Sequence, residues 1–294
     1  MKRIRLLFLI IVLLVSAEKT SSADNPLRVE YLPRVVKQGG VCFIRASGPA
    51  SIKTIYGEFR GTIFPLGLGA QNRTYEGLIG VDMDTEPTTY DFKVVATDGN
   101  RRTYTSALLL KVESANFRTQ TLSLPSSMVD LDPQTLEWVE REEKRLKALF
   151  QGYRDERLWR GAFVRPVQGE PTTAFGLRRI INGRTRNPHT GVDLRAEEGT
   201  PVLASNSGVV ALLDQLFFSG KSVILDHGWG TYSMYFHLSE TLVREGDRVR
   251  TGAMLGRVGS TGRSKGPHLH WGIRINGARV DPLALLRLTE HLRE

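Results

Sequence analysis

Two short stretches near the C-terminal end of the chain carry histidine and aspartate at spacings that suit a metal site. The first reads Gly266-Pro-His-Leu-His-Trp271, a turn that feeds a strand, because proline sits well at the first residue of a strand. Residues two apart on a strand point to the same face, so His268 and His270 should project side by side. A pair of imidazoles on one strand face can bind a metal or place a base beside one.

The second stretch lies upstream and reads Pro188-His-Thr-Gly-Val-Asp193. Pro188 and Gly191 argue against a helix, so the segment is predicted to be extended, with His189 and Asp193 on one face. His189, Asp193 and one of the two later histidines would supply three nitrogen or oxygen ligands. Three protein ligands with an open fourth position are typical of a catalytic zinc rather than of a structural one.

Length and composition set the class of protein. The chain has 294 residues, so two domains plus connectors are expected. Hydrophobic residues make up 40% and charged residues 24%, which suits ordinary cores, and 29 Gly and 13 Pro between short apolar runs favour a β-rich protein. The net charge of +9 suits an anionic surface such as a cell wall. No basic stripe is interleaved with aromatic residues, so a nucleic-acid partner is not expected.

Residues 1–23 have the three-part form of a secretory signal peptide. Lys2, Arg3 and Arg5 form the positive region, and an uninterrupted apolar run from Leu6 to Val15 follows. This run is too short to span a bilayer comfortably, and no cysteine follows it that could carry a lipid. We therefore expect cleavage, export to the periplasm or the medium, and no stable membrane anchor afterwards.

The rest of the chain is predicted to be mainly β. Residues 24–115 read as a succession of short strands that fits an immunoglobulin-like β-sandwich. Residues 116–160 are expected to be a helical linker, because Asp132-Pro133 is a helix start followed by apolar residues at partly helical spacing. Residues 161–287 return to short strands too closely spaced for parallel crossovers, so a compact antiparallel β domain is expected, with 288–294 as a polar tail.

Three separated motifs in this last domain resemble those of the lysostaphin/LytM-type zinc endopeptidases. They are His189-Thr-Gly-Val-Asp193, Tyr235-Phe-His-Leu238, and the run from Val258 that ends in His268-Leu-His270. They occur in the order and with the internal spacings of that family, from about Gly161 to Leu286. The family often places an acidic residue soon after the last histidine, where this chain has Trp271-Gly272, but that position is not a metal ligand there.

The resemblance implies a zinc ion held by His189, Asp193 and His270, with His237 and His268 beside the metal-bound water. We expect these two histidines to be the general base and the transition-state stabiliser, and the sequence does not decide which histidine has which role. Spacing alone leaves a second arrangement open. In that arrangement, His189, His268 and His270 would bind the metal, and Asp193 would only support one of these ligands. No His-Glu-x-x-His helix is present, so the usual carboxylate base is absent, and histidine suits proton transfer near neutral pH.

The implied function is a zinc-dependent peptidoglycan hydrolase that cuts peptide cross-links, with D,D-cross-links between stem peptides expected over glycine bridges. The signal peptide would place the chain with that substrate. Two alternatives remain: a degenerate, non-enzymatic domain that activates other wall hydrolases, and a module that only recognises wall or a secretion partner. Degenerate domains lose metal ligands, whereas all five positions are filled here. The sequence specifies no oligomeric state.

Other residues are given structural roles. Cys42, the single cysteine, is expected to be a buried small hydrophobe on a strand. His227 lies in a glycine-rich turn and is expected to be a turn or surface residue, and His291 lies in the polar tail. The arginines around the Asn182-Gly183 turn belong either to an exposed hairpin or to a basic wall that receives carboxylates of a peptide stem; they are Arg178, Arg179, Arg184 and Arg186.

Overall fold

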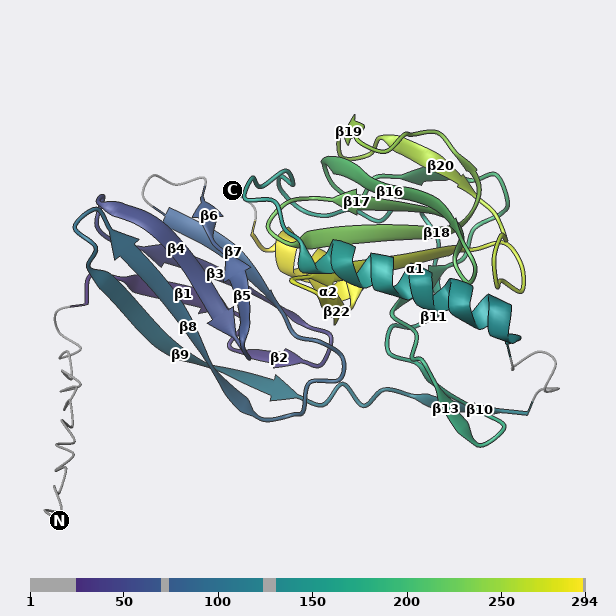
Figure 1. Cartoon of the computed structure of the whole chain (residues 1–294), viewed down its shortest axis with the longest axis horizontal. Helices are drawn as coiled ribbons and strands as arrows, with labels where there is room; N and C mark the ends of the chain where they lie inside the picture. Colours follow the sequence, from purple (N-terminus) through teal and green to yellow (C-terminus); the bar gives the residue numbers. More distant parts are fainter. Residues whose placement is uncertain (1–24, 70–73, 124–130, 293–294) are drawn as a thin grey trace, which may run out of the picture.

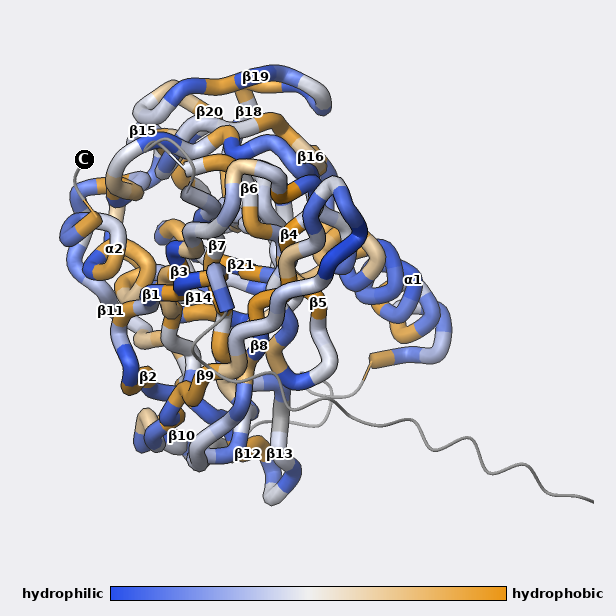
Figure 2. Tube along the Cα trace, turned by 90° about the vertical axis from the view of Figure 1, so that its left-hand side faces the viewer, coloured by the Kyte–Doolittle hydropathy of each residue, from blue (hydrophilic) through white to orange (hydrophobic). Residues whose placement is uncertain are grey.

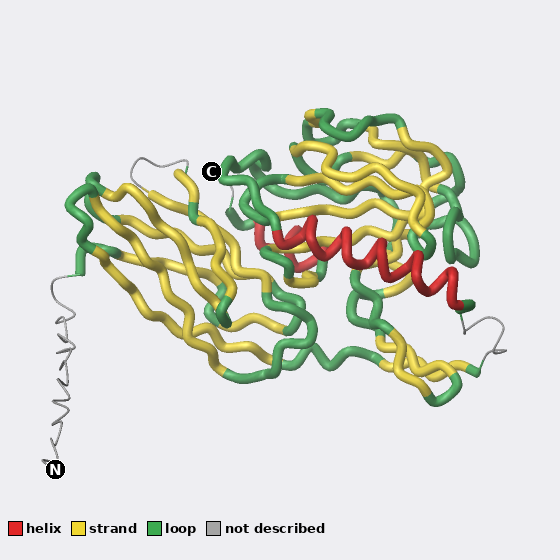
Figure 3. The backbone as a smooth tube through the Cα atoms, viewed as in Figure 1, coloured by secondary structure: helices red, strands yellow, loops and turns green. Residues whose placement is uncertain are grey.

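The computed structural model describes residues 25–69, 74–123 and 131–292, and the expected signal peptide lies outside these residues. Figure 1 shows two β-rich bodies, with a long helix, α1, lying along the C-terminal one. Strands dominate, as Figure 3 shows, and the mainly β fold class predicted from the sequence is confirmed. No helix among the described residues is long and apolar enough to cross a bilayer.

The N-terminal body consists of two sheets that pack face to face. Strand β8 shows why, since Phe92, Val94 and Ala96 alternate with more exposed residues and turn into the core. Cys42 is fully buried there, as expected, and burial raises the pKa of its thiol to about 12. One sheet has the order β1 (Arg28–Leu32), β3 (Val41–Ser47), β7 (Thr74–Gly80), β6 (Gly67–Leu68); the other has the order β2 (Val35–Lys37), β9 (Thr103–Glu113), β8 (Thr89–Asp98), β4 (Ile52–Phe59), β5 (Thr62–Pro65).

Helix α1 (Pro133–Gln151) begins where the sequence predicts a helix start. The Asp132 carboxylate accepts a hydrogen bond from the Thr135 backbone N–H at 3.0 Å, and proline occupies the first turn. Figure 2 shows α1 as mostly hydrophilic, whereas hydrophobic segments run along the strands of the interior. The apolar side of α1 packs on the C-terminal sheet through Phe150, whose ring meets Tyr232 edge to face at 5.5 Å.

The C-terminal body is built on a 10-stranded sheet. Its main path is β11 (Pro171–Thr173), β14 (Gly191–Leu194), β21 (Leu269–Ile275), β18 (Thr231–Thr241), β17 (Gly220–Asp226), β16 (Gly208–Leu216), β19 (Arg248–Val249), with β15 (Pro201–Leu203), β20 (Met254–Val258) and β22 (Ala278–Val280) attached beside it. A small separate sheet joins β10 (Thr119–Leu122), β12 (Arg178–Ile181) and β13 (Arg184–Arg186).

Register in the large sheet sorts its residues into two faces. Val192, Trp271 and Tyr235 lie opposite one another on β14, β21 and β18, and all three are buried in the main core. The next residues along these strands point to the other face, because side chains alternate. That other face carries Asp193 and His270.

The two bodies share one continuous core. Val41, Phe43 and Leu78 of the sandwich belong to the same buried cluster as the interior of the C-terminal sheet. Arg279 also binds Asp82 across the junction at 2.9 Å. Rigid placement of the sandwich against the sheet follows from this packing.

Helix α2 (Pro282–Glu290) closes the C-terminal body. It continues three residues past the point where a polar tail was expected to begin, and Thr289 is buried. The Thr289 hydroxyl accepts a hydrogen bond from the Phe163 backbone N–H at 3.1 Å, which ties the last turn of the helix to the start of the domain.

Candidate metal centre and flanking histidines

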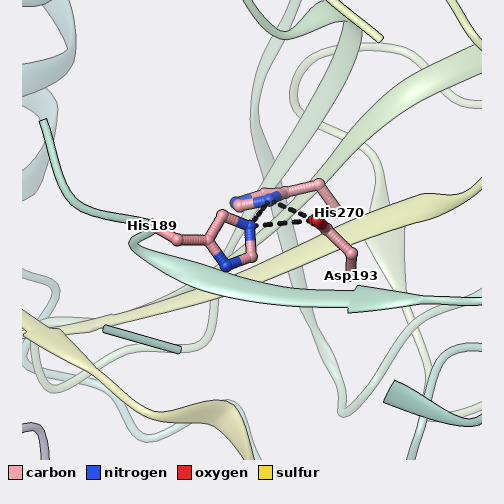
Figure 4. Close-up of side chains that lie close together, drawn as sticks. All are labelled: His189, Asp193 and His270. Carbon is pink, nitrogen blue, oxygen red and sulfur yellow. Dashed lines mark hydrogen bonds and ion pairs between the residues drawn. The ribbon is translucent and has the colours of Figure 1, made fainter. Parts of the chain in front are cut away.

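Three side chains from two segments of the chain converge on the sheet face opposite the main core. His189 lies in the loop before β14, Asp193 lies on β14, and His270 lies on β21 (Figure 4). Their potential ligand atoms all lie within 4.8 Å of one another. His189 Nε2 is 2.9 Å from Asp193 Oδ1, and His270 Nδ1 is 3.0 Å from the same oxygen.

Backbone pairing places each of the three. Asp193 and His270 are directly opposite in the antiparallel β14–β21 pair. His189 Nδ1 donates to the Ala174 carbonyl at 3.0 Å, and its backbone N–H donates to the Leu177 carbonyl at 3.0 Å. The hydrogen bond at Nδ1 orients the ring so that Nε2 faces Asp193 and His270.

Gly191 makes room for this arrangement. A Cβ at this position would lie 2.4 Å from the Trp271 carbonyl oxygen and 2.7 Å from His270 Nε2, so any side chain would displace the strand or the ring. On its other side, the His270 ring stacks on Phe236 at 5.5 Å between centroids, with 5° between the planes.

The protonation states of the cluster suit a cation. Burial lowers the pKa of His270 to about 4, so its ring is neutral. Burial raises the pKa of Asp193, but hydrogen bonds from His189 and His270 outweigh it, and the net pKa lies well below the ordinary value. The ring nitrogens of His189 and His270 and a carboxylate oxygen of Asp193 thus converge on one point, as the ligands of a divalent cation do. Ligand atoms of a tetrahedral zinc lie about 3.3 Å apart, close to the observed separations, so the residues fit Zn²⁺.

The other two predicted histidines stand beside this cluster. The His237 and His268 rings are 4.8 Å apart, and the His237 ring is 6.2 Å from that of His270. His268 Nε2 is 3.7 Å from Asp193 Oδ1, farther than the corresponding atoms of His189 and His270. The three potential metal ligands that lie closest together are therefore His189, Asp193 and His270, and His268 is not among them.

His237 reaches the site through an irregularity in β18. Between Tyr235 and Leu238 this strand has one more residue than its partner β17, which marks a β-bulge, and His237 itself has φ of 66°. Its backbone N–H donates to the Ser219 carbonyl at 2.8 Å, and its Nδ1 donates to the Thr261 carbonyl at 2.8 Å. Burial lowers the pKa of His237.

His268 is oriented in a similar way. Its Nδ1 donates to the Gly266 carbonyl at 2.9 Å, and the Ser264 hydroxyl lies 3.2 Å from the same nitrogen. Leu269 points to the opposite face and is fully buried, so His268 and His270 do share one face.

Sequence reasoning singled out neither Phe236 nor Thr261; the place of Phe236 one residue before His237 is the one signal that could have found it.

His227 was expected to be a turn or surface residue, and the surface part of that expectation is wrong. The side chain is fully buried, with Nδ1 donating to the Ser207 carbonyl at 2.7 Å and Nε2 2.7 Å from the Ser233 hydroxyl. The turn that carries it folds inward, since a Cβ on the following Gly228 would lie 1.8 Å from the Glu156 carbonyl oxygen. Burial lowers the pKa of His227 to about 4.

The arginine-rich segment is a β-hairpin, with β12 paired to β13. Its turn residues Asn182 and Gly183 both have positive φ, as a tight hairpin requires. Strand β10 from the linker adds to it in parallel. Arg184 is exposed, whereas Arg179 is half-buried.

Comparison with known proteins adds a family. Residues 187–282 match the profile of Peptidase family M23. The DD-carboxypeptidase/endopeptidase Mpg of Neisseria meningitidis is 42% identical over 123 residues, which are 42% of this chain and 28% of that protein. The peptidoglycan DD-endopeptidase ShyA of Vibrio cholerae is 34% identical over 139 residues, 47% of this chain and 30% of that protein. The chain thus spans less than a third of the length of either curated relative.

A solved structure extends the likeness beyond the family match. The crystal structure of a putative peptidase M23 from Pseudomonas aeruginosa has a TM-score of 0.65 at 28% identity, and the alignment covers 85% of this chain and 94% of that chain. A match of this extent reaches well outside residues 187–282, so the similar fold includes parts of the chain that the family profile does not.

Proposed function

The chain belongs to peptidase family M23, and from this premise we propose that it is a zinc-dependent endopeptidase that hydrolyses peptide cross-links of bacterial peptidoglycan. We place the preferred bond in the D,D-cross-links between stem peptides. One observation carries the proposal: a two-histidine, one-aspartate cluster with two further histidines directly beside it.

Zn²⁺ is the cofactor of this centre, and His189, Asp193 and His270 would hold it. Zinc in such a three-residue site supplies a Lewis acid that polarises a carbonyl and lowers the pKa of a water molecule to about 7. The cluster is accessible enough for this role, since the side chains of His189, Asp193 and His270 are 9%, 12% and 11% exposed.

His237 and His268 would handle the proton. His237 donates from Nδ1 to the Thr261 carbonyl, which leaves a lone pair at Nε2, and its lowered pKa keeps the ring neutral near pH 7. We assign it as the base that accepts the proton of the attacking water. His268 lies on the Asp193 side of the cluster, and we assign it as the residue that stabilises the oxygen that gains negative charge.

The substrate follows from the relatives and from the charge of the chain. The names of Mpg and ShyA describe enzymes that act on DD bonds, and that of ShyA specifies peptidoglycan. The net charge of +9 complements an anionic wall. Export to the periplasm or the medium, as the N-terminal sequence predicts, would bring the chain to this substrate.

The test is zinc content together with hydrolysis of purified peptidoglycan. We expect about one zinc per chain, release of new peptide ends, loss of that release with a chelator, and recovery on adding zinc. His291→Ala is the matched control, because His291 is an exposed histidine at the end of α2 and should retain full activity. Zinc-loaded protein that releases no peptide ends from peptidoglycan, or release that a chelator leaves unchanged, would contradict the proposal.

A further inference from the structure

Helix α1 lies outside the family match but borders the metal centre. It packs on the sheet face that carries Phe236, and Phe236 lies opposite His270 in the β18–β21 pair. In Figure 1, α1 runs along β18 on this side of the C-terminal body. The helix therefore flanks the same face on which the metal residues lie.

The first half of α1 holds an aromatic side chain in a fixed position. Trp138 is 43% exposed, yet its ring meets Phe217 edge to face at 5.4 Å. The Glu142 carboxylate accepts the Phe217 backbone N–H at 3.0 Å. Glu142 thus ties this part of α1 to the loop that follows β16, the loop against which the indole packs.

That loop leads directly to the catalytic histidine. Phe217 contacts Phe218 at 5.0 Å between rings, and the Phe218 carbonyl accepts the Arg263 backbone N–H at 2.9 Å. The Ser219 carbonyl accepts the backbone N–H of His237. Phe217, which contacts Trp138, is therefore two residues along the loop from Ser219, which is hydrogen-bonded to the backbone of the proposed general base.

We propose that Trp138, supported edge to face by Phe217, forms a sugar-binding platform on which a ring of the glycan strand stacks while its attached peptide lies at the metal centre. The inference rests on the proposed function and extends it to the polysaccharide part of the substrate. It also gives α1 a role in substrate binding that residues 187–282 do not supply.

The chemistry of the patch favours a sugar over a protein partner. A stable protein interface buries about 800 Å² on each side, whereas the apolar surface here is a single indole edged by half-buried phenylalanines. Glu142 and Arg145 follow Trp138 along the same side of the helix, Arg145 paired with Asp214, and both carry groups that can hydrogen-bond hydroxyl groups. A partly exposed indole with polar side chains nearby suits a pyranose ring, which has an apolar face and a polar edge.

The experiment compares Trp138→Ala with Leu136→Ala, a loss of an exposed apolar residue on the same helix. Two substrates are used with the zinc-loaded full chain: intact peptidoglycan and a cross-linked peptide dimer that lacks sugars. We expect Trp138→Ala to raise KM on peptidoglycan about tenfold, equivalent to about 1.4 kcal/mol, with kcat unchanged and no effect on the sugar-free dimer. Trp138→Phe should restore part of the loss, and Leu136→Ala should behave as wild type.

Binding to peptide-free glycan strands provides a readout that needs no hydrolysis. We expect co-sedimentation with these strands for the wild type and about tenfold weaker binding for Trp138→Ala. Equal binding by the two, or an equal loss of activity on both substrates, would overturn the platform. A wild type that binds glycan through Trp138 but cleaves neither substrate would support the platform while refuting the proposed activity.

Discussion

The buried imidazole of His227 should make the stability of this protein depend on pH in a defined window. The folded pKa is about 4, against 6.5 for the free side chain, because burial disfavours the charged ring. Below pH 6.5 the unfolded chain therefore binds a proton that the folded chain refuses. The stabilisation from His227 is complete above that pH and is lost as the pH falls toward 4, which is the sign expected for a base whose pKa is lowered by folding.

The size of the effect follows from the shift. A shift from 6.5 to about 4 corresponds to about 3 kcal/mol in full, of which about 2 kcal/mol is lost between about pH 7.5 and about pH 5. Other titrating groups also change the free energy of unfolding with pH. Their contribution cancels when the wild type is compared with His227→Gln, which lacks the titrating ring. His227→Gln should be less stable than wild type near pH 7.5, and the gap should narrow by about 2 kcal/mol near pH 5.

The assay is urea unfolding of zinc-stripped wild type and His227→Gln at both pH values, followed by the fluorescence of buried Trp229 and Trp271. Stripping the metal from both proteins prevents pH-dependent zinc release from entering the comparison. A gap that stays constant between the two pH values would show that the ring is not kept neutral by burial, and the reasoning would be refuted.

Further predictions concern the metal centre. His270→Ala should lose bound zinc, whereas His268→Ala should keep zinc and lose activity by about 10²- to 10⁴-fold. Equal zinc content in the two variants would contradict the assignment of His270 as a metal ligand and of His268 as a residue that acts beside the metal. Gly191→Ala should weaken zinc binding, because its Cβ would lie 2.7 Å from His270 Nε2 and force the ring to move. Competition with a chromophoric chelator measures this, and unchanged zinc affinity would show that the strand accommodates the methyl group without moving the ligand.

Local sequence was enough for several elements. The start of α1 at Asp132-Pro133 followed from capping chemistry that involves only neighbouring residues. The shared face of His268 and His270 followed from strand alternation, with Leu269 buried on the other side. The β-rich class followed from short apolar runs separated by turn residues. In each case the interactions that decide the structure lie within a few residues along the chain.

The contacts of the candidate site depended on the fold. In a straight strand, residues four apart such as His189 and Asp193 lie about 13 Å from each other, but a bend before β14 brings their side chains to 2.9 Å. The side-by-side position of Asp193 and His270 is a matter of strand register, which is set by pairing between distant segments.

His237 and His227 show most clearly which features depend on local sequence and which depend on the tertiary fold. Strict alternation would turn His237 away from the face of its neighbour Phe236, and only the bulge in β18 brings its ring to the metal side. His227 looks like a turn residue until the turn folds against the segment around Glu156 and buries it. The sequence alone determined which residue types and which local elements were available. Long-range packing and strand register decided which side chains meet, because these depend on contacts between segments far apart in the chain.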